Sequence, residues 1–416
     1  MTQPLIQPFA ALRPPLRFAA DVVAPPYDVL TADEARERAA GKPWSFLHIS
    51  RPEIDLTPSV DPHAPEVYAK AAGNLQRMLA AGVLVRDRVP AYYAWRMHMG
   101  AHTQTGIAVA ASVAAYDASR IRRHEFTRPD KEDDRVRQIE ALNAQTGPVL
   151  LAYPDAPEID AILAAVSGAP AAVDVTADTG VRHQLWDIVD AASIEVITNA
   201  FERLSALYIA DGHHRSAAAS RVAASRRGAD PAAHHERFLA VAFPQAQMQI
   251  LAYNRVVTDL NGLTEEAFLA QVAVRFATAR SDVAVAPGRP GEFGLYLRGR
   301  WYRLQVRPEL VARDDPVARL DVSLLGDQLL SPVLAIHDPR RDARIDFVGG
   351  IRGLAELEAR VDARGMACAI SMFPTSMTDL MAVADAHRIM PPKSTWFEPK
   401  LADGLLSLVL DEEGAK

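Results

Sequence analysis

Residues 204–225 read LSALYIADGHHRSAAASRVAAS. The apolar run 204–210 predicts a short buried strand, and the alanine-rich run 216–225 predicts a helix. Between them the five-residue block DGHHR, which we call the DGHHR box, occupies 211–215. The chain therefore leaves a buried strand, turns at Gly212 and enters a helix, which indicates a fold built from both strands and helices.

The DGHHR box has the residue types that bind an anion. The first N–H groups of a helix have no partner within the helix and attract negative charge, and histidine rings and a guanidinium add further donors. We predict that Gly212, His214 and Arg215 bind phosphate and that Asp211 and His213 take part in catalysis. Asp211 is predicted either to cap the helix or to hold Mg²⁺ beside the phosphate.

The structural alternative for the box is an Asp211 N-cap with two histidines that only pack or face solvent. The crevice at a strand-to-helix junction, where α/β folds commonly bind ligands, favours the functional interpretation for the block as a whole. Zinc is disfavoured because adjacent histidines on a turn rarely converge on one metal.

Composition limits the class of protein. The chain has 416 residues, a formal net charge of -7 and a single cysteine, Cys368. The acidic balance argues against nucleic-acid binding, and one cysteine permits no intrachain disulfide. Without a signal-peptide pattern or an apolar run of membrane-spanning length, the expected location is the cytoplasm, with a small-molecule substrate and no membrane partner.

Working outward from the box, strands and helices alternate along the chain, with hairpins between some of the strands. We predict a mixed α/β (α+β) fold with two lobes, 1–257 carrying the box and 258–416. Individual expectations include helices at 31–40 and 65–81, a strand at 44–49 and hairpins within 91–117 and 293–306.

A second polar cluster, 122–135, follows a predicted buried strand. Arg123 and His124 suit an anionic ligand, and Glu125 is a candidate general base. For 130–137 a solvated helix start with i,i+4 charge pairs is the favoured interpretation.

A third cluster, 390–400, has prolines that stiffen a loop and polar side chains that suit phosphate or carboxylate. The candidates are Lys393, Ser394 and Thr395, with Lys400 as a further site residue. A packed C-terminal tail with lysines reaching solvent is the alternative. Two acids on proline-stiffened loops complete the set, Asp28 as a site residue and Glu53 as a catalytic candidate, for which a turn role is the alternative.

Four blocks together resemble the family known as domain of unknown function 1015: APPYDVL (24–30), RRHEFTRPDKEDDR (122–135), IADGHHRSAAA (209–219) and MPPKSTWFEPKL (390–401). More remotely, a strand followed by DGHHR and a helix is similar to the phosphate-binding box of the ParB and sulfiredoxin superfamily, which includes free-serine kinases. That resemblance implies a ParB/sulfiredoxin-like core and nucleotide phosphates bound at 211–215.

Three departures restrict the resemblance. The box contains no cysteine, which argues against sulfiredoxin activity, and no basic helix-turn-helix is evident, which argues against chromosome partitioning. Relatives usually carry an aromatic residue after DGHHR, where this chain has Ser216.

The sequence thus predicts a phosphotransferase that acts on a small metabolite, with an amino-acid hydroxyl as the acceptor. The expected cofactor is Mg²⁺, and ATP, ADP or pyrophosphate would be the phosphate donor. Two alternatives stay open: a hydrolase of phosphate esters or nucleotides, and a non-catalytic nucleotide sensor of the ParB-like kind.

Overall fold

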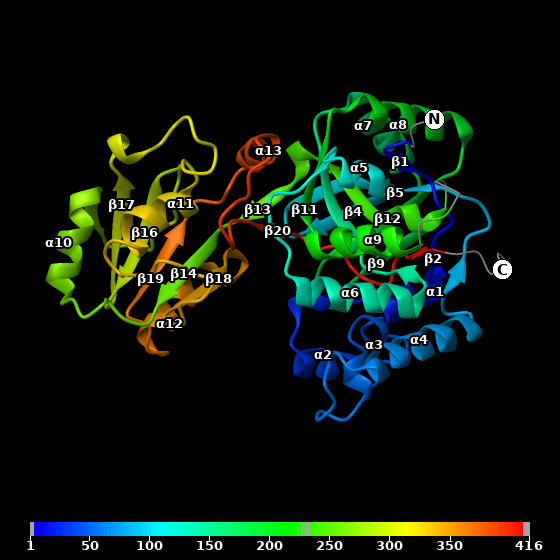
Figure 1. The fold of residues 1–416 in the computed structure, drawn as a ribbon, viewed down its shortest axis with the longest axis horizontal. Coiled ribbons are helices and arrows are strands. Elements are labelled where there is room, and N and C mark those ends of the chain that lie inside the picture. The colour runs from blue at the N-terminus through cyan, green and yellow to red at the C-terminus, as the bar shows by residue number, and fades with distance from the viewer. Residues whose placement is uncertain (1–3, 227, 229–232, 411–416) are drawn as a thin grey trace. The chain divides into compact units, whose positions relative to one another are not determined.

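The structure is a computed structural model that describes residues 4–226, 228 and 233–410. The chain forms two compact units, drawn in Figure 1. Unit 1 comprises Met1–Met248 and Pro399–Lys416, and unit 2 comprises Gln249–Glu398. The predicted division at 257/258 differs from this one in two ways: the first crossing comes earlier, and the chain returns to unit 1 after Glu398.

Unit 1 is built on a mixed sheet whose strands run in the order β6-β11-β8-β12-β5-β4-β10-β9, with β1 paired to β5. Its strands are β1 (Ile6–Gln7), β4 (Tyr92–Met99), β5 (His102–Ser112), β6 (Ile121–Arg122), β8 (Val149–Tyr153), β9 (Val173–Thr176), β10 (Arg182–Ile188), β11 (Leu207–Asp211) and β12 (Arg237–Pro244). β11 lies parallel to β6 and β12 parallel to β8, whereas the other pairs are antiparallel. The predicted mixed α/β class is therefore confirmed.

Helices pack against this sheet and against one another. They are α1 (Leu16–Val22), α2 (Ala32–Ala39), α3 (Leu47–Ser50), α4 (Pro65–Ala80), α5 (Val113–Asp117), α6 (Pro129–Leu142), α7 (Pro157–Val166), α8 (Ala191–Arg203) and α9 (His213–Arg226). In Figure 1, α9 and α6 lie side by side. Ala217, Ala219 and Ala223 of α9 belong to the main core, while Ala218 and Val222 pack toward Ile139 of α6. Small side chains on both faces allow α9 to approach its neighbours closely.

The N-terminal segment pairs with residues from the C-terminal part of unit 1. Leu12 bridges to Ser407 and Ala24 to Asp403, both antiparallel. In addition, β21 (Leu408–Val409) pairs with β7 (Ala144–Gln145). These pairings bring APPYDVL beside the chain that follows EPKL.

Unit 2 contains an antiparallel sheet in the order β15-β17-β16-β19-β14-β18. Its strands are β14 (Tyr253–Val257), β15 (Phe276–Ser281), β16 (Glu292–Leu297), β17 (Arg300–Val306), β18 (Ile345–Gly349) and β19 (Cys368–Met372), and its α-helices are α10 (Glu265–Arg275), α11 (Asp321–Leu325), α12 (Gly353–Asp362) and α13 (Met377–Asp385). A separate antiparallel pair joins β13 (Gln249–Leu251) to β20 (Trp396–Glu398).

The predicted strand at 44–49 is wrong, because the chain forms α3 there and continues into a 3-10 turn at Pro52–Asp55. Phe46, Leu47 and Ile49 are all buried in one cluster with residues of α2 and α4. A short apolar run does not distinguish a buried strand from a buried helical turn, and here tertiary packing selected the helix. The helices at 31–40 and 65–81 are confirmed as α2 and α4, and α2 has its capping box at Thr31 and Glu34.

Within the described part of the chain, no helix is both long enough and apolar enough to cross a membrane.

Candidate functional site

The DGHHR box lies at the end of β11, as predicted. Gly212 follows the strand with φ +97°, a left-handed conformation that favours glycine, and α9 begins at His213. His213, His214 and Arg215 therefore form the first turn of the helix, where N–H groups are available to an anion. Asp211 is the last residue of the strand, so Gly212 and not Asp211 directly precedes the helix.

Asp211 is held by two cations. The Lys400 ammonium donates to Oδ2 at 3.0 Å, and the Nη2 atom of Arg215 lies 3.6 Å from Oδ1. Burial alone would raise the pKa of this carboxyl group, but Lys400 and Arg215 together hold the pKa well below its usual range. Asp211 is therefore ionised at neutral pH, and its side chain keeps 29% exposure through which a ligand could reach it.

The Arg215 guanidinium is buried and held by several close contacts. Its side chain is 9% exposed, Nη1 donates to the Pro148 carbonyl at 2.5 Å, and Nη2 lies 4.0 Å from Asp28. Burial opposes the charge, whereas Asp211 and Asp28 favour it, and the net effect raises the pKa of Arg215. Among the described residues Nε has no hydrogen-bond partner. A permanently charged, buried guanidinium thus keeps one donor uncommitted beside the Gly212 turn.

His213 packs against His124, whose backbone N–H donates to its Nε2 at 3.5 Å. The two rings meet edge to face with centroids 4.6 Å apart, and Nδ1 of His213 lies 3.8 Å from the Glu125 carboxylate. Burial lowers the pKa of His213 well below its usual value, and the His124 ring adds to this. For His124, burial lowers the pKa to about 4. Both rings are neutral at physiological pH, so they act through hydrogen bonds and not through charge.

His214 binds the other end of the same segment. Its Nε2 accepts a hydrogen bond of 3.1 Å from the backbone N–H of Arg128. Because His213 holds His124 and His214 holds Arg128, the two box histidines fix residues 124–128 at both ends. The second predicted cluster is thereby joined to the box, as expected, and β6 next to β11 brings it there.

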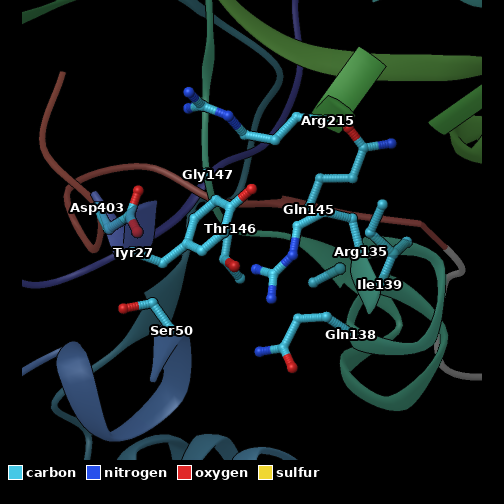
Figure 2. A pocket seen from close by; sticks show the side chains of 11 residues that line it. Tyr27, Ser50, Arg135, Gln138, Ile139, Gln145, Thr146, Gly147, Arg215 and Asp403 are labelled. Atoms are coloured by element: carbon cyan, nitrogen blue, oxygen red, sulfur yellow. The ribbon is translucent and has the colours of Figure 1, made fainter. Parts of the chain in front are cut away.

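A pocket of about 30 Å³ lies beside Arg215 (Figure 2). It is lined by Tyr27, Ser50, Arg135, Gln138, Ile139, Ala144, Gln145, Thr146, Gly147, Arg215 and Asp403. This volume is enough for about two water molecules or one small polar group of a ligand, and it is too small for a whole nucleotide. The lining comes from the segments that precede α2 and follow Lys400, from α3 and α6, from β7 and the two residues after it, and from the box.

The chemistry of this pocket is polar and highly charged. The Arg135 guanidinium lies 3.9 Å from the centre of the Tyr27 ring, and Figure 2 shows this ring between Arg135 and Asp403. Asp403 is 2% exposed, and within the described ranges its Oδ1 has no hydrogen-bond partner. Burial raises its pKa to about 7, although Arg215 opposes the shift. The pocket therefore contains a carboxyl group that changes charge near neutral pH.

The family described as "Protein of unknown function (DUF1015)" matches residues 6–323. The chain belongs to this family. The match includes the first three of the four sequence blocks, and the fourth, 390–401, follows it. No curated protein gave a significant match.

Several solved structures align with this DUF1015 protein at low identity. A conserved hypothetical protein from Pyrococcus furiosus is 13% identical, with 72% of this chain and 94% of that chain covered and a TM-score of 0.34. A free serine kinase in complex with AMP is 12% identical, with coverages of 70% and 86% and a TM-score of 0.33. SbnI with a C-terminal truncation, from Staphylococcus aureus, is 11% identical, with coverages of 73% and 87% and a TM-score of 0.39.

The structure brings two of the predicted acids of the DUF1015 protein to the same neighbourhood. Asp28 lies on the Tyr27–Val29 turn, 4.0 Å from Arg215. Glu53 accepts a 2.6 Å bond from Arg51, whose Nη1 also donates to the Tyr27 carbonyl at 2.8 Å. Arg51 thus links Glu53 to the loop that carries Asp28.

Arg123 contacts α5, and three candidates of the third cluster, Lys393, Ser394 and Thr395, belong to unit 2, whereas Lys400 of that cluster contacts Asp211. Arg123 is exposed and donates to the Tyr116 hydroxyl at 3.4 Å, so it points to α5. Lys393, Ser394 and Thr395 belong to unit 2. Their described contacts lie within unit 2: the Lys393 carbonyl accepts from Arg255 at 3.0 Å, and the Ser394 hydroxyl donates to the Pro391 carbonyl at 2.5 Å. Their predicted role in phosphate binding stays a prediction.

Sequence reasoning did not select several residues that line the pocket, namely Tyr27, Ser50, Arg135, Gln145 and Asp403. Tyr27 and Arg135 lie within the family blocks, so the blocks themselves were a usable signal. Arg135 was assigned to a solvated helix face, whereas its side chain is only 13% exposed and is bound to Asp134. Asp403 follows the last block and had no distinguishing pattern.

No group of three or more histidine, cysteine or acidic side chains within the described residues is arranged to hold a metal ion. Asp211 by itself offers one ionised carboxylate. If Mg²⁺ binds here, its remaining ligands would have to be phosphate oxygens and water, which is how Mg²⁺ often binds in phosphoryl-transfer sites.

Proposed function

We propose that this DUF1015 protein is a phosphotransferase that moves a phosphoryl group from a nucleotide or pyrophosphate to the hydroxyl group of a small metabolite, with a hydroxy amino acid as the acceptor. The observation that carries the proposal is the buried Arg215 guanidinium, whose Nε is uncommitted at a glycine turn that opens a helix. Helix N–H groups and a guanidinium at one point form an anion site that suits phosphate oxygens better than neutral ligands.

Each residue of the box has a place in this proposal. Gly212 and the first N–H groups of α9 would bind phosphate oxygens, and Arg215 and Lys400 would balance the negative charge that moves during transfer. Asp211 would bind Mg²⁺ on the phosphates. His213 and His214, both acceptors for segment 124–128, would fix the geometry of the site.

The carboxylate of an acidic residue must accept the proton of the attacking hydroxyl group. The hydroxyl oxygen forms a bond to the terminal phosphorus, the bond to the leaving phosphate oxygen breaks, and the proton passes to a carboxylate. Glu125 and Glu53 remain the candidates. Glu125 is 51% exposed beside His213, and Glu53 is 12% exposed and bound to Arg51, so Glu125 has the easier access to a ligand.

The test is an incubation of purified protein with Mg²⁺, a donor (ATP, ADP or pyrophosphate) and serine, threonine or homoserine, followed by ³¹P NMR and mass spectrometry. A phosphorylated amino acid that disappears in Arg215→Ala and persists in Arg221→Ala supports the proposal. Arg221 is the matched control, since it lies on the same helix at 45% exposure. Free phosphate alone would indicate a hydrolase, and binding without turnover a sensor; either result overturns the proposal.

A further inference from the structure

Two exposed apolar residues, Phe126 and Val29, are sequence neighbours of residues that contact the DGHHR box. Phe126 is 74% exposed, which makes it the most exposed large hydrophobic residue in the described part of the chain and the only exposed aromatic one. Val29 is 42% exposed. Single exposed apolar residues are common on protein surfaces, so their position relative to the box decides whether they matter.

Phe126 lies on a segment that the box itself holds in place. Residue 125, its neighbour, lies 3.8 Å from His213 through its carboxylate, and residue 128 donates to His214 at 3.1 Å. With both ends of 124–128 bound to the first turn of α9, the backbone at Phe126 stays beside the phosphate-binding end of the helix. An exposed ring on a fixed backbone loses little conformational entropy when a ligand covers it.

Val29 approaches the box from the N-terminal segment. It follows Asp28, which lies 4.0 Å from Arg215 and close enough to His214 to favour its protonated form. Arg51 fixes this turn through the carbonyls of Tyr27 and Leu30. The box therefore contacts two separate, anchored segments, and each segment carries one exposed apolar side chain.

We propose that Phe126 and Val29 form the walls of a nucleobase subsite, so that the phosphate donor is a nucleotide and not pyrophosphate. This inference rests on the proposed function and names the donor class. A nucleobase has two apolar faces and is joined to its phosphates through the sugar, so it reaches only a limited distance from the phosphate site. Pyrophosphate has no apolar part that these side chains could contact. Stacking on one ring face tolerates any base, so the proposal concerns nucleotides as a class.

The experiment measures the dissociation constants of ADP and of pyrophosphate by calorimetry for the wild type, Phe126→Ala, Val29→Ala and the control Val189→Ala, which changes a side chain of 56% exposure elsewhere in unit 1. We expect Phe126→Ala to weaken ADP binding by roughly 5- to 150-fold, the range for one lost stack, with pyrophosphate affinity unchanged. Val29→Ala should weaken ADP binding less, and Val189→Ala should change neither. In a Phe126→Trp variant, ADP but not pyrophosphate should change the tryptophan fluorescence.

The outcomes separate the two proposals. If both ligands bind and Phe126→Ala leaves both affinities unchanged or lowers them equally, the nucleobase subsite is overturned and the phosphate site stands. If neither ADP nor pyrophosphate binds the wild type, the proposed function fails together with the subsite. A surface for a partner protein would leave ADP affinity intact in Phe126→Ala and so also overturn the inference.

Discussion

Lys400 and Asp211 are separated by 189 residues in the sequence, yet the lysine ammonium donates to the aspartate Oδ2 at 3.0 Å. Asp211 ends the strand β11, and Lys400 comes after the chain has passed through the whole of unit 2. Among the neighbouring groups, Lys400 contributes most to lowering the pKa of Asp211, so this pairing keeps the Asp211 carboxyl group of the box ionised. It also joins the last of the four sequence blocks to the third.

A double-mutant cycle should detect this pair. We expect Asp211→Asn and Lys400→Met to show a coupling of about 0.5 to 1 kcal/mol in the free energy of unfolding at low ionic strength, because both side chains are partly exposed. Urea unfolding measures it. The more exposed pair Arg182–Asp174 serves as the control and should couple less. Equal coupling in the two cycles would show that Asp211–Lys400 is an ordinary surface pair.

Arg215→Ala should weaken phosphate or nucleotide binding by about 1 to 3 kcal/mol, the range for losing a charge-assisted hydrogen bond. Arg215→Lys keeps the charge and loses the fork of donors, so it should recover only part of the affinity. Calorimetric titration gives both values, and circular dichroism checks that each variant is folded. Phosphate affinity that is unchanged in folded Arg215→Ala would remove the box from the ligand site.

Gly212→Ala should reduce both stability and phosphate affinity. Besides its left-handed backbone, a Cβ at this position would lie 3.0 Å from the Arg215 Nε. Gly180 is a suitable control, since it has φ +82° and nothing within 4 Å of its Cβ position. Backbone strain alone should make Gly180→Ala cost about 1 to 2 kcal/mol. Thermal unfolding should show a larger loss for Gly212→Ala, and only that variant should bind phosphate more weakly.

Asp403→Asn should change how stability depends on pH. Burial raises the pKa of Asp403 to about 7, whereas an aspartate in the unfolded chain titrates near 4. Between these values the folded protein binds more protons at this site than the unfolded chain does, so the site's contribution to stability falls as pH rises.

The variant lacks this titration, and its free energy of unfolding relative to wild type should therefore rise by on the order of 2 kcal/mol from pH 5 to pH 7.5. Denaturant unfolding at several pH values tests this. Parallel profiles for the two proteins would mean that Asp403 is ionised throughout this range.

Local sequence patterns were sufficient for the part of the site that is continuous in the chain. The strand, the glycine turn and the helix of 204–225 were all readable because each has its own periodicity or composition. His124 and Glu125 were also selected as site residues from the sequence, but the two-residue strand β6 that brings them to the box was not predicted.

The rest of the site depends on packing between segments far apart in the chain, which produces no recognisable local sequence pattern. Asp403 pairs with Ala24, and the Arg135 guanidinium lies against the Tyr27 ring, so both pocket residues are held by contacts with residues far away in the sequence. The same limit explains the wrong strand at 44–49, where burial against α2 and α4 decided the conformation. Charge density at 130–137 suggested solvent exposure, yet Asp134 is buried and accepts from the Tyr68 hydroxyl at 2.8 Å.

The antiparallel pair β13–β20 has a consequence for the order of synthesis and folding. Gln249 lies opposite Glu398, so the two ends of unit 2 are already side by side when that unit is complete. A ribosome makes all of unit 2 before Lys400 and Asp403, and until then the box lacks a cation and the pocket lacks one wall. Without this pair, residues 249–398 would form a long loop whose closure costs entropy. With the pair formed, the residues from Pro399 onward continue from a strand that is already in place. The nascent chain therefore completes its anion site only after the whole of unit 2 has been made.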